Sequence, residues 1–307
     1  MLVYRGYSQT AHRATVLTIG NFDGVHIGHR ALLARLTRTA ASVGLPSAVL
    51  TFEPHPREFF APQAAPPRLS TLREKLELVA DDGVDVAYVC RFNAAFASMT
   101  ADQFIERVLV GGLRARHLIV GDDFRFGARR AGDFARLRAA GAHSGFVVEA
   151  MESITLDGVR ASSSAVREAL QEGRLEHAAT LLGRPYSIDG RVVRGEQLGR
   201  QLGFATANIR IKHDRPPLLG VFAVEVKGLP GGPHRGAANL GYRPTAGQEA
   251  RPLLEVHLFD FAADIYGAHL NVRFLHKLRD EMKFADLAAL KARIALDVAA
   301  AKAYFQS

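Results

Sequence analysis

The chain has 307 residues, and its 48% hydrophobic and 23% charged residues are typical of a folded globular protein of about two domains. This composition excludes a disordered chain. The 39 basic and 31 acidic residues give a net charge of +8, but the arginines are scattered and no basic stripe alternates with aromatic residues, so charge alone selects neither nucleic acid nor an anionic small molecule.

Cysteine content and hydropathy bear on the cellular compartment. Cys90 is the one cysteine, which excludes an internal disulfide framework and a cysteine-based zinc site. No apolar run approaches the ~18 residues of a membrane span, and residues 1–20 contain no sustained apolar segment of the kind found in signal peptides. We therefore expect a cytoplasmic protein that does not enter a membrane.

The first half of the chain alternates short β-rich runs with helical periodicity. Strands are predicted at residues 15–20, 47–52, 84–90, 117–120 and 145–150. Helices are predicted at 30–42, from a capping box at Thr71 and Glu74, from a second box at Thr100 and Gln103 to residues 111–112, and at 133–140. This repetition indicates a parallel sheet with helices on both faces. Ligands of such sheets bind beyond the carboxyl ends of the strands, so a site is expected after residues 20, 52 and 121.

The pattern changes near Leu182. Helical turns at 164–182 give way to strand candidates at 220–227, 235–240, 253–261 and 269–275, which have no crossover helices between them. Such a series indicates an antiparallel barrel or sandwich. A helix at 284–304 closes the chain, with one apolar face made of Leu287, Leu290, Ile294 and Val298. The pattern predicts one domain at residues 1–182 and a second at 183–307.

The segment 20–29 (GNFDGVHIGH), between the first predicted strand and its helix, carries the first motif. Its glycines let a ligand approach the backbone closely, and the helix N-terminus offers free N–H groups to a phosphate. His26 and His29 can donate hydrogen bonds to phosphate oxygens and to the charge that develops in phosphoryl transfer. An isolated pair of this kind is more often a surface feature, and a zinc site lacks further ligands nearby. The strand before it and the helix after it favour a phosphate site.

A second motif opens the helical turns at 164–182. Ser162, Ser163 and Ser164 are followed by Arg167. Serine hydroxyls cap helices and also bind phosphate, and the guanidinium fork of Arg167, one turn further on, suits the same anion. Taken alone, the serines are better explained as an ordinary helix N-cap.

Together the two motifs resemble the nucleotidyltransferase superfamily, in which H-x-G-H is paired with a downstream S-[ST]-x-x-R. The whole chain resembles the prokaryotic bifunctional FAD synthetases, which combine a riboflavin kinase with an FMN adenylyltransferase. The similar segments, in chain order, are 18–29 (TIGNFDGVHIGH), 51–56 (TFEPHP), 121–127 (GDDFRFG), 162–167 (SSSAVR), 181–186 (LLGRPY), 199–208 (GRQLGFATAN), 243–245 (RPT), 254–261 (LEVHLFDF) and 277–284 (KLRDEMKF).

The resemblance implies both the fold and the chemistry. The fold is expected to be a doubly wound, Rossmann-like α/β nucleotidyltransferase domain, followed by an antiparallel β-barrel flavokinase domain with a C-terminal helix. The implied reactions are phosphorylation of riboflavin to FMN by ATP, and then adenylylation of FMN to FAD with release of pyrophosphate.

In the first domain the resemblance assigns ATP binding to residues of both motifs: Gly20, Phe22, His26, Gly28, His29, Ser163, Ser164 and Arg167. The attacking FMN phosphate is already an anion, so His29 and Arg167 are expected to stabilise charge rather than remove a proton. Mg²⁺ is expected to bridge the phosphates. The flavin is expected at Phe52, Pro54, His55, Pro56, Asp123, Phe124 and Phe126. Core packing is the alternative for Phe52 and Phe126, and Asp23 is open to a role in shaping the turn alone.

In the second domain the implied reaction is attack of a ribityl hydroxyl on the γ-phosphate of ATP, which benefits from a base. Strand alternation puts Leu254, Val256 and Leu258 on one face and Glu255 with His257 on the other. Glu255 matches the family's proposed catalytic base, and a solvated strand carboxylate is the alternative.

The metal and the ATP of this reaction also have expected partners. Thr206 and Asn208 match the family's Mg²⁺–phosphate ligands, and Gly195, Gly199 and Arg200 belong to the preceding glycine-rich, ATP-binding loop. The chain departs from the family pattern at four positions: Ala205 replaces a proline, Gln197 a frequent lysine, Tyr242 a smaller residue, and Ala161 a branched aliphatic residue. None of these removes a proposed catalytic group.

Two other functions stay open: an adenylyltransferase whose kinase half is inactive, and a basic flavin- or RNA-binding regulator without turnover. The favoured prediction has riboflavin, FMN and ATP as small-molecule substrates. It includes no nucleic acid, no membrane and no obligatory protein partner, and it leaves a homo-oligomer open.

Overall fold

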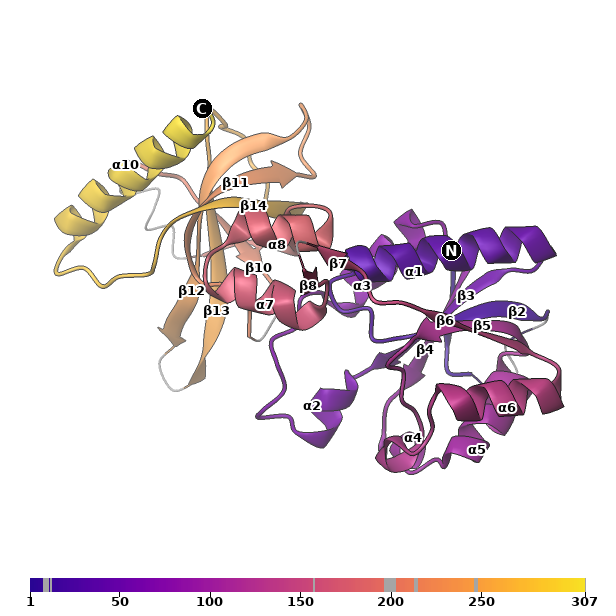
Figure 1. Ribbon diagram of the computed structural model, residues 1–307. Coiled ribbons are helices and arrows are strands. Elements are labelled where there is room, and N and C mark those ends of the chain that lie inside the picture. The colour runs from indigo at the N-terminus through magenta and orange to yellow at the C-terminus, as the bar shows by residue number, and fades with distance from the viewer. Residues whose placement is uncertain are drawn as a thin grey trace. The chain divides into compact units, whose positions relative to one another are not determined.

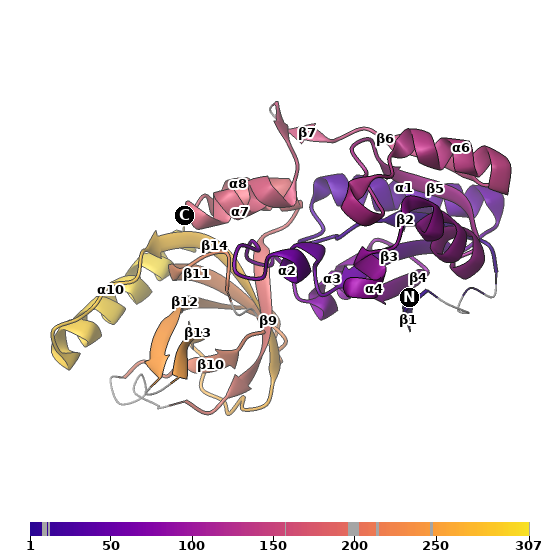
Figure 2. The ribbon, with the colours of Figure 1, turned by 90° about the horizontal axis from the view of Figure 1, so that it is seen from below.

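The computed structural model describes residues 1–7, 11, 13–156, 158–195, 203–212, 215–245 and 248–306. These residues form two compact units, one of Met1–Pro66 with Leu72–Ser162 and one of Pro67–Thr71 with Ser163–Ser307 (Figure 1, Figure 2). Within the described ranges, no helix is both long enough and apolar enough to cross a membrane.

A six-stranded parallel sheet forms the centre of the first unit. Its strands are β1 (Leu2–Arg5), β2 (Thr15–Ile19), β3 (Ser47–Glu53), β4 (Val86–Arg91), β5 (Ala115–Gly121) and β6 (Val147–Met151), in the order β1-β4-β3-β2-β5-β6. Each neighbouring pair is parallel, so the predicted sheet is confirmed. The edge strand β1 was not predicted, because its four residues are too few and too exposed to give a buried or alternating pattern.

Helices cover both faces of this sheet (Figure 1). They are α1 (Ile27–Val43), α2 (Pro56–Phe60), α3 (Leu72–Asp81), α4 (Ala94–Ala97), α5 (Ala101–Gln103), the π-helix η1 (Phe104–Gly112), the 3-10 turn η2 (Ala128–Arg130) and α6 (Phe134–Ser144). The predicted capping box at Thr100 and Gln103 is confirmed at the start of α5. A short hairpin, β7 (Thr155–Leu156) with β8 (Val159–Arg160), completes the unit.

Two hydrophobic clusters, one on each side of the sheet, show why helices cover both of its faces. Val16 of β2 packs in the cluster that contains Leu36 of α1 and Val79 of α3. Its neighbour Leu17 packs in the other cluster, with Leu109 of η1 and Leu137 of α6. Because successive strand residues point to opposite faces, a continuously apolar strand such as β2 needs helices on both sides.

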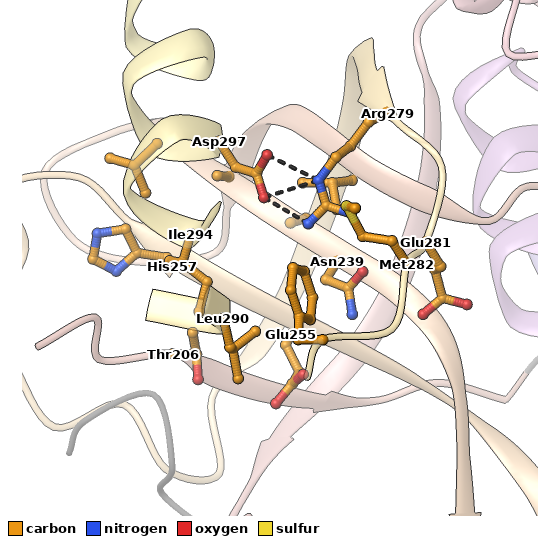
Figure 3. A pocket seen from close by; sticks show the side chains of 15 residues that line it. Thr206, Asn239, Glu255, His257, Arg279, Glu281, Met282, Leu290, Ile294 and Asp297 are labelled. Atoms are coloured by element: carbon orange, nitrogen blue, oxygen red, sulfur yellow. Dashed lines mark hydrogen bonds and ion pairs between the residues drawn. The ribbon is translucent and has the colours of Figure 1, made fainter. Parts of the chain in front are cut away.

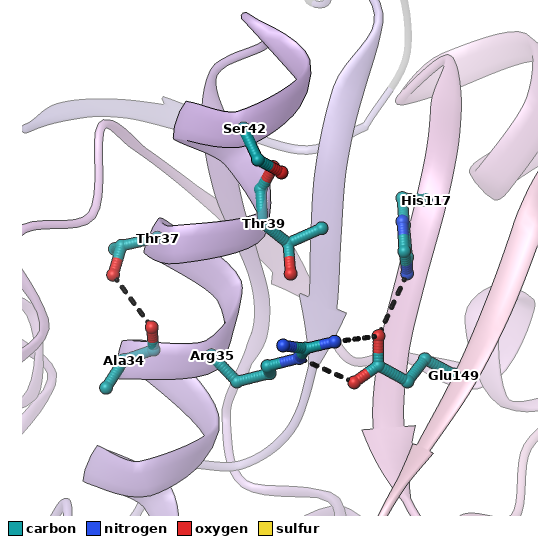
Figure 4. A network of polar contacts seen from close by, with 7 residues as sticks. All are labelled: Ala34, Arg35, Thr37, Thr39, Ser42, His117 and Glu149. Carbon is teal, nitrogen blue, oxygen red and sulfur yellow. Dashed lines mark hydrogen bonds and ion pairs between the residues drawn. The ribbon is translucent and has the colours of Figure 1, made fainter.

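A polar network connects α1 to the last two strands of the sheet. Arg35 of α1 donates from Nε to Glu149 Oε1 at 2.7 Å and from Nη2 to Oε2 at 3.2 Å, and His117 Nε2 lies 3.3 Å from Oε2 (Figure 4). The hydrogen bond from Arg35 is the largest influence on the pKa of Glu149, which lies below its ordinary value. The network therefore holds α1 against β5 and β6 at neutral pH.

The second unit contains a closed antiparallel barrel. Its strands are β9 (Tyr186–Val193), β10 (Ala207–Arg210), β11 (Gly220–Lys227), β12 (His234–Thr245), β13 (Gln248–Leu258) and β14 (His269–Arg279), closed in the order β10-β13-β12-β11-β14-β9. Closure pairs the strands that would otherwise be edges. The predicted alternation in β13 is confirmed, because Leu254, Val256 and Leu258 are all buried.

Three helices accompany the barrel among the described residues of this unit. They are α7 (Ser163–Gln171), α8 (Leu175–Leu182) and α10 (Leu287–Tyr304). In α8, the side that includes Leu181 and Leu182 is buried, and the helix lies against β9 and β14. Apart from Pro67–Thr71, the compact unit of the barrel thus begins at Ser163, whereas the predicted functional boundary follows Leu182.

The C-terminal helix α10 closes one side of the barrel unit. Asp286 caps its first turn by accepting the backbone N–H of Ala289 at 2.7 Å. Of the predicted apolar stripe, Leu290, Ile294 and Val298 line a cavity of the barrel. Leu287, the other residue of that predicted face, is 56% exposed. It lies in the first turn, close to where the helix begins.

Candidate active sites

The turn between β2 and α1 places two imidazoles at a helix N-terminus. Phe22 and Val25 adopt positive φ angles of 49° and 40°, and both side chains are buried. His26 is the N-cap of α1, where its Nδ1 accepts the backbone N–H of His29 at 3.4 Å. The two imidazole rings stack with centroids 3.7 Å apart. The predicted phosphate-binding turn therefore has its two histidines side by side.

His29 is held in its neutral form. Its pKa lies well below the ordinary value, first because the ring is buried, and then because His26 and Lys75 lie nearby. Its Nδ1 is buried and has no hydrogen-bond partner among the described residues. A buried polar atom without a partner is costly, so a ligand that offers one hydrogen bond here gains affinity.

A cavity of about 240 Å³ lies against this turn, at the carboxyl ends of β2, β5 and β6. Seven predicted site residues line it: Gly20, Phe22, His26, Gly28, His29, Asp123 and Phe124. Of its other polar residues, Ser162 belongs to the second motif, whereas the sequence did not point to Glu152, Ser153 and Arg160. Arg160 donates to the Asp123 carboxylate at 2.8 Å, which links the hairpin β7–β8 to the loop after β5.

The other predicted flavin residues do not line this cavity. Phe52 lies at the end of β3, packed against Phe92 and Phe96. His55 is the N-cap of α2, where Pro56 is the first residue and the Nδ1 of His55 accepts the N–H of Arg57 at 3.1 Å. The capping role of His55 does not depend on a ligand.

Phe126 and Pro54 complete that predicted set. Phe126 is 6% exposed and stacks on Phe124, so it belongs to the hydrophobic core. Pro54 follows β3 directly. Core packing, the alternative considered for Phe126, is what its burial supports.

The second motif starts α7, in the compact unit of the barrel. Ser163 and Ser164 are its first residues. Arg167 is 8% exposed, and its Nε donates to the carbonyl oxygen of Pro67 at 2.6 Å. Part of its hydrogen-bonding capacity is therefore used within its own unit, and its action on ATP stays a prediction.

A second cavity, of about 170 Å³, lies in the barrel unit between β12, β13 and α10 (Figure 3). Two predicted residues, Thr206 and Glu255, line it. His257, on the same face of β13 as Glu255, also lines it. Its Nδ1 lies 2.9 Å from the carbonyl oxygen of Ala205, which can only accept a hydrogen bond, so the Nδ1–H donates. The backbone carbonyl of Ala205, one of the positions that differ from the family pattern, therefore accepts a hydrogen bond from His257.

The register of three strands puts three polar residues in one row. Glu255 of β13 is paired with Asn208 of β10 on one side and with Asn239 of β12 on the other. Asn208 is 8% exposed. Gly195 lies so close to the Asn208 amide that any side chain at position 195 would collide with it. The backbone at Gly195 thus approaches Asn208 closely, and its predicted contact with ATP stays a prediction.

Sequence reasoning missed the other polar residues of this cavity. Arg279, at the end of β14, donates to both carboxylate oxygens of the buried Asp297 of α10, with an Nη2–Oδ2 distance of 2.7 Å (Figure 3). Glu281 lies in the segment between β14 and α10. Burial raises its pKa, and the nearby positive charge of Arg279 opposes this rise.

Three positions that the sequence analysis named, Gly199, Arg200 and Gln197, lie outside the described residues. Among the residues that are described, no three histidine, cysteine, aspartate or glutamate side chains gather as a metal site. Thr206 and Asn208 instead offer a hydroxyl and an amide oxygen beside the Glu255 carboxylate, the hard donors that Mg²⁺ takes when substrate phosphates supply the rest.

Comparison with known proteins gives a consistent result. Residues 8–165 match the FAD synthetase family, and residues 182–305 match the riboflavin kinase family. Proteins named bifunctional riboflavin kinase/FMN adenylyltransferase from Pseudomonas fluorescens and Escherichia coli K12 are each 50% identical to this chain. The similarity to the first spans 95% of this chain and 93% of the relative, and the similarity to the second spans 97% of this chain and 95% of the relative. A solved structure described as a macrolide-efflux protein from Streptococcus pneumoniae has a TM-score of 0.82 at 26% identity and covers 97% of both chains.

Proposed function

The chain belongs to the family of bifunctional riboflavin kinase/FMN adenylyltransferases, and we propose that its two cavities divide the two reactions between them. The protein phosphorylates riboflavin to FMN with ATP and adenylylates FMN to FAD. We assign adenylylation to the cavity beside His26 and His29, and phosphorylation to the cavity beside Glu255. The observation that carries this assignment is the row formed by Asn208, Glu255 and Asn239 in the barrel. In this row the Glu255 carboxylate lies between two asparagine side chains.

In adenylylation, the FMN phosphate attacks the α-phosphorus of ATP and pyrophosphate leaves. The nucleophile is an anion, so the protein's task is to align two phosphates and to stabilise charge. Neutral His29 and His26 suit that task as hydrogen-bond donors at the start of α1. Ser163, Ser164 and Arg167 are proposed to bind the same triphosphate, and the loops around Phe52 and Phe124 the flavin.

In the kinase reaction, a ribityl hydroxyl must lose its proton as it attacks the γ-phosphorus of ATP. Glu255 is proposed to accept this proton. Thr206 and Asn208 are proposed to hold Mg²⁺, which would supply positive charge to neutralise the phosphates. Gly195 leaves space for the Asn208 amide, which supports a role for the loop 195–200 in ATP binding.

The functional boundary is proposed to follow Leu182, so that residues 1–182 carry adenylylation and 183–307 carry phosphorylation. This division keeps Arg167 with the histidines as parts of one catalytic set, although α7 and α8 belong to the compact unit of the barrel. The proposed compartment is the cytoplasm, where ATP serves both reactions, and the proposed partners are small-molecule substrates alone.

Glu255→Gln tests the assignment of the barrel cavity. The variant keeps the size of the side chain and removes the basic oxygen, so FMN formation should fall by about 10²–10⁴, the range typical of general bases. The purified protein is incubated with riboflavin, ATP and Mg²⁺, and the flavins are separated by chromatography. Adenylylation of supplied FMN in the same preparation is the control and should not change.

The other outcomes of that assay separate the alternatives. Near-normal FMN formation by Glu255→Gln would overturn the base assignment. Parallel loss of both activities would indicate misfolding. A wild-type chain that binds riboflavin but forms no ATP-dependent product would be a flavin-binding regulator, and one that adenylylates FMN without making it would be an enzyme with an inactive kinase half.

A further inference from the structure

Lys75 is a buried cation to which neither proposed reaction has given a role. Residues 1–182 contain 20 arginines and this one lysine. Lys75 lies in α3 and is 4% exposed. A lysine is almost never buried so deeply unless its ammonium group is paired. The contacts of this group therefore show what the lysine is kept for.

Helix periodicity places Lys75 near the H-x-G-H turn. Lys75 lies one turn before Val79, which packs in the cluster between the sheet and helices α1 and α3. In the same way, His29 lies one turn before Leu33 of α1, another member of that cluster. Residues at i and i+4 share a helix face, and both helices follow strands of a parallel sheet. Lys75 and His29 therefore lie at the same end of one apolar cluster.

Two hydrogen bonds connect Lys75 to the turn itself. Its Nζ donates to Thr51 Oγ1 at 3.5 Å, and the Thr51 hydroxyl donates to the carbonyl oxygen of Asn21 at 3.3 Å. Thr51 is 1% exposed and lies near the carboxyl end of β3. Its single hydroxyl proton is used on Asn21, so Oγ1 accepts from Lys75. The donors thus run in one direction, from the ammonium group to the peptide of Asn21.

The peptide that receives this contact precedes a strained stretch of backbone. Phe22 and Val25 have φ angles of 49° and 40°, a region that bulky and β-branched residues rarely adopt. Such conformations persist only where the surrounding contacts over-determine them. The Asn21 carbonyl belongs to the peptide that enters Phe22, so the contact from Thr51 is one of those that hold the turn in this shape.

The charge of Lys75 acts on the same site. Lys75 is not among the described residues that line the cavity beside the turn, so it acts from behind the turn rather than by touching a phosphate. Burial is the main cause of the low pKa of His29, and the charges of His26 and Lys75 lower it further. A buried charge is weakly screened. The charge that opposes protonation of His29 therefore also favours an anionic triphosphate at the cavity.

We propose that Lys75 is a positioning residue of the adenylylation site, whose ammonium group fixes the strained turn through Thr51 and the Asn21 carbonyl and supplies positive charge to the buried side of that turn. This inference rests on the proposed assignment of adenylylation to the cavity beside His26 and His29. A compact ammonium group on a flexible stem fits a narrow buried position better than a planar guanidinium, which accounts for one lysine among 20 arginines.

Lys75→Met and Thr51→Val test the proposal in the full-length enzyme with FMN and ATP as substrates. Lys75→Met should raise the KM for ATP by about 10- to 100-fold, as expected for a lost charge-assisted contact, and Thr51→Val by up to about tenfold. Thr51→Ser keeps the hydroxyl and should stay near the wild type. The combination Lys75→Met/Thr51→Val should be less severe than the product of the single effects, because Lys75 acts partly through the hydroxyl. An unchanged KM in either single variant, or a full product in the combination, would contradict the proposal.

The pH dependence of adenylylation separates the charge of Lys75 from a purely structural contribution. The acid limb of kcat/KM reports the groups that must be unprotonated in the free enzyme, and the phosphate of FMN titrates identically with every variant. Without the positive charge the pKa of His29 should rise, so the acid limb should move to higher pH in Lys75→Met. It should not move in Thr51→Val, which keeps the charge. An unmoved limb in Lys75→Met would contradict the electrostatic role.

Two controls show whether the effects are specific to this site. Riboflavin phosphorylation, measured in the same preparations, should not change in any of these variants. Arg73→Met also removes one cation from α3, but the Arg73 side chain is 66% exposed and pairs with Glu77 four residues further on, so the KM and the acid limb should stay in place. Parallel loss of both activities in Lys75→Met would assign Lys75 to folding alone and overturn the proposal.

His29→Ala in the same assays separates this inference from the assignment on which it rests. If His29→Ala keeps adenylylation of FMN, the cavity beside the turn is not the adenylylation site and both statements fail. If His29→Ala loses adenylylation but Lys75→Met and Thr51→Val behave as the wild type, the cavity assignment stands and the positioning role of Lys75 is wrong.

Discussion

His26 and His29 stack their imidazole rings 3.7 Å apart, and the Nδ1 of His26 accepts the backbone N–H of His29. This hydrogen bond requires an unprotonated Nδ1, so a neutral His26 carries its proton on Nε2. Two stacked cations would repel each other in a buried site. The pair therefore acts as two neutral hydrogen-bond donors that are preorganised at the start of α1.

His29→Ala should cripple FAD formation while FMN still accumulates from riboflavin. Removal of one donor to a developing charge typically costs ~3 kcal/mol, or about 10² in rate. Chromatography of the flavins from riboflavin, ATP and Mg²⁺ gives both activities in one sample. Arg167→Ala is expected to give the same pattern if its guanidinium binds the triphosphate. Undiminished FAD synthesis by both variants would remove the H-x-G-H assignment.

The neutral state of His29 predicts a pH-dependent stability. Its folded pKa lies below the ordinary value of 6.5, so between the two values the unfolded chain binds a proton that the folded chain does not. The stability gained from burying neutral His29 is complete above pH 7 and is lost as the pH falls below 6.5, with a slope of at most about 1.4 kcal/mol per pH unit.

Urea unfolding at pH 7.0 and at pH 5.5 measures this slope. His29→Gln, which does not titrate, should lose less stability than the wild type over that interval. Glu149 does not affect the difference between the two proteins over this interval. Its pKa is lowered from 4.5, chiefly by the hydrogen bond from Arg35, so its contribution to the free energy of unfolding is lost only at lower pH. Equal slopes in both proteins would show that His29 is protonated in the folded state.

Local patterns in the sequence predicted the sheet, most of the barrel and the position of Glu255. A period of two is enough to say which side of β13 carries Glu255, and the burial of Leu254 and Val256 confirms it. The strand–turn–helix context likewise placed His26 at the start of a helix. These features depend on residues close in sequence, for which spacing and chemistry are informative.

The missed residues depend on contacts that form only when the barrel closes. Arg279 ends β14 and Asp297 lies in α10, and nothing in either segment indicates that they pair. Asn239 sits in a strand of alanine and glycine neighbours, where an asparagine has no distinctive chemistry until the β12–β13 register sets it opposite Glu255. Lys75 affects His29 from a helix that follows a different strand. Spacing in one sequence carries no signal for such pairs.

Cys90 should be chemically silent in the folded protein. Burial raises the pKa of its thiol to about 12, and Cys90 is 1% exposed, near the end of β4. The thiolate is the reactive form, so reaction with a disulfide reagent at pH 8 should require opening of the sheet. Its rate should be at least ~10³ lower than in guanidinium chloride, where one thiol per chain reacts promptly. Rapid labelling without denaturant would show that β4 is accessible.

Asp297→Asn should detach the C-terminal helix from the barrel and impair the kinase reaction alone. The Asp297 and Arg279 side chains are 6% and 14% exposed, and removal of one partner of a buried pair typically costs 3–5 kcal/mol, roughly, because the other charge stays buried. The cavity wall formed by Leu290, Ile294 and Val298 would then be displaced. Riboflavin phosphorylation should fall with a raised KM, thermal unfolding should show a destabilised barrel, and adenylylation of supplied FMN should persist.

Arg293→Ala is the milder control, since Arg293 is 37% exposed and makes a single contact of 3.2 Å to Asp297, which is worth ~1 kcal/mol or less. The apolar pair Arg279→Met/Asp297→Leu should recover most of the lost stability, because replacement of both charges leaves none unpaired. If Asp297→Asn unfolds at the wild-type temperature, the ion pair does not hold α10 in place.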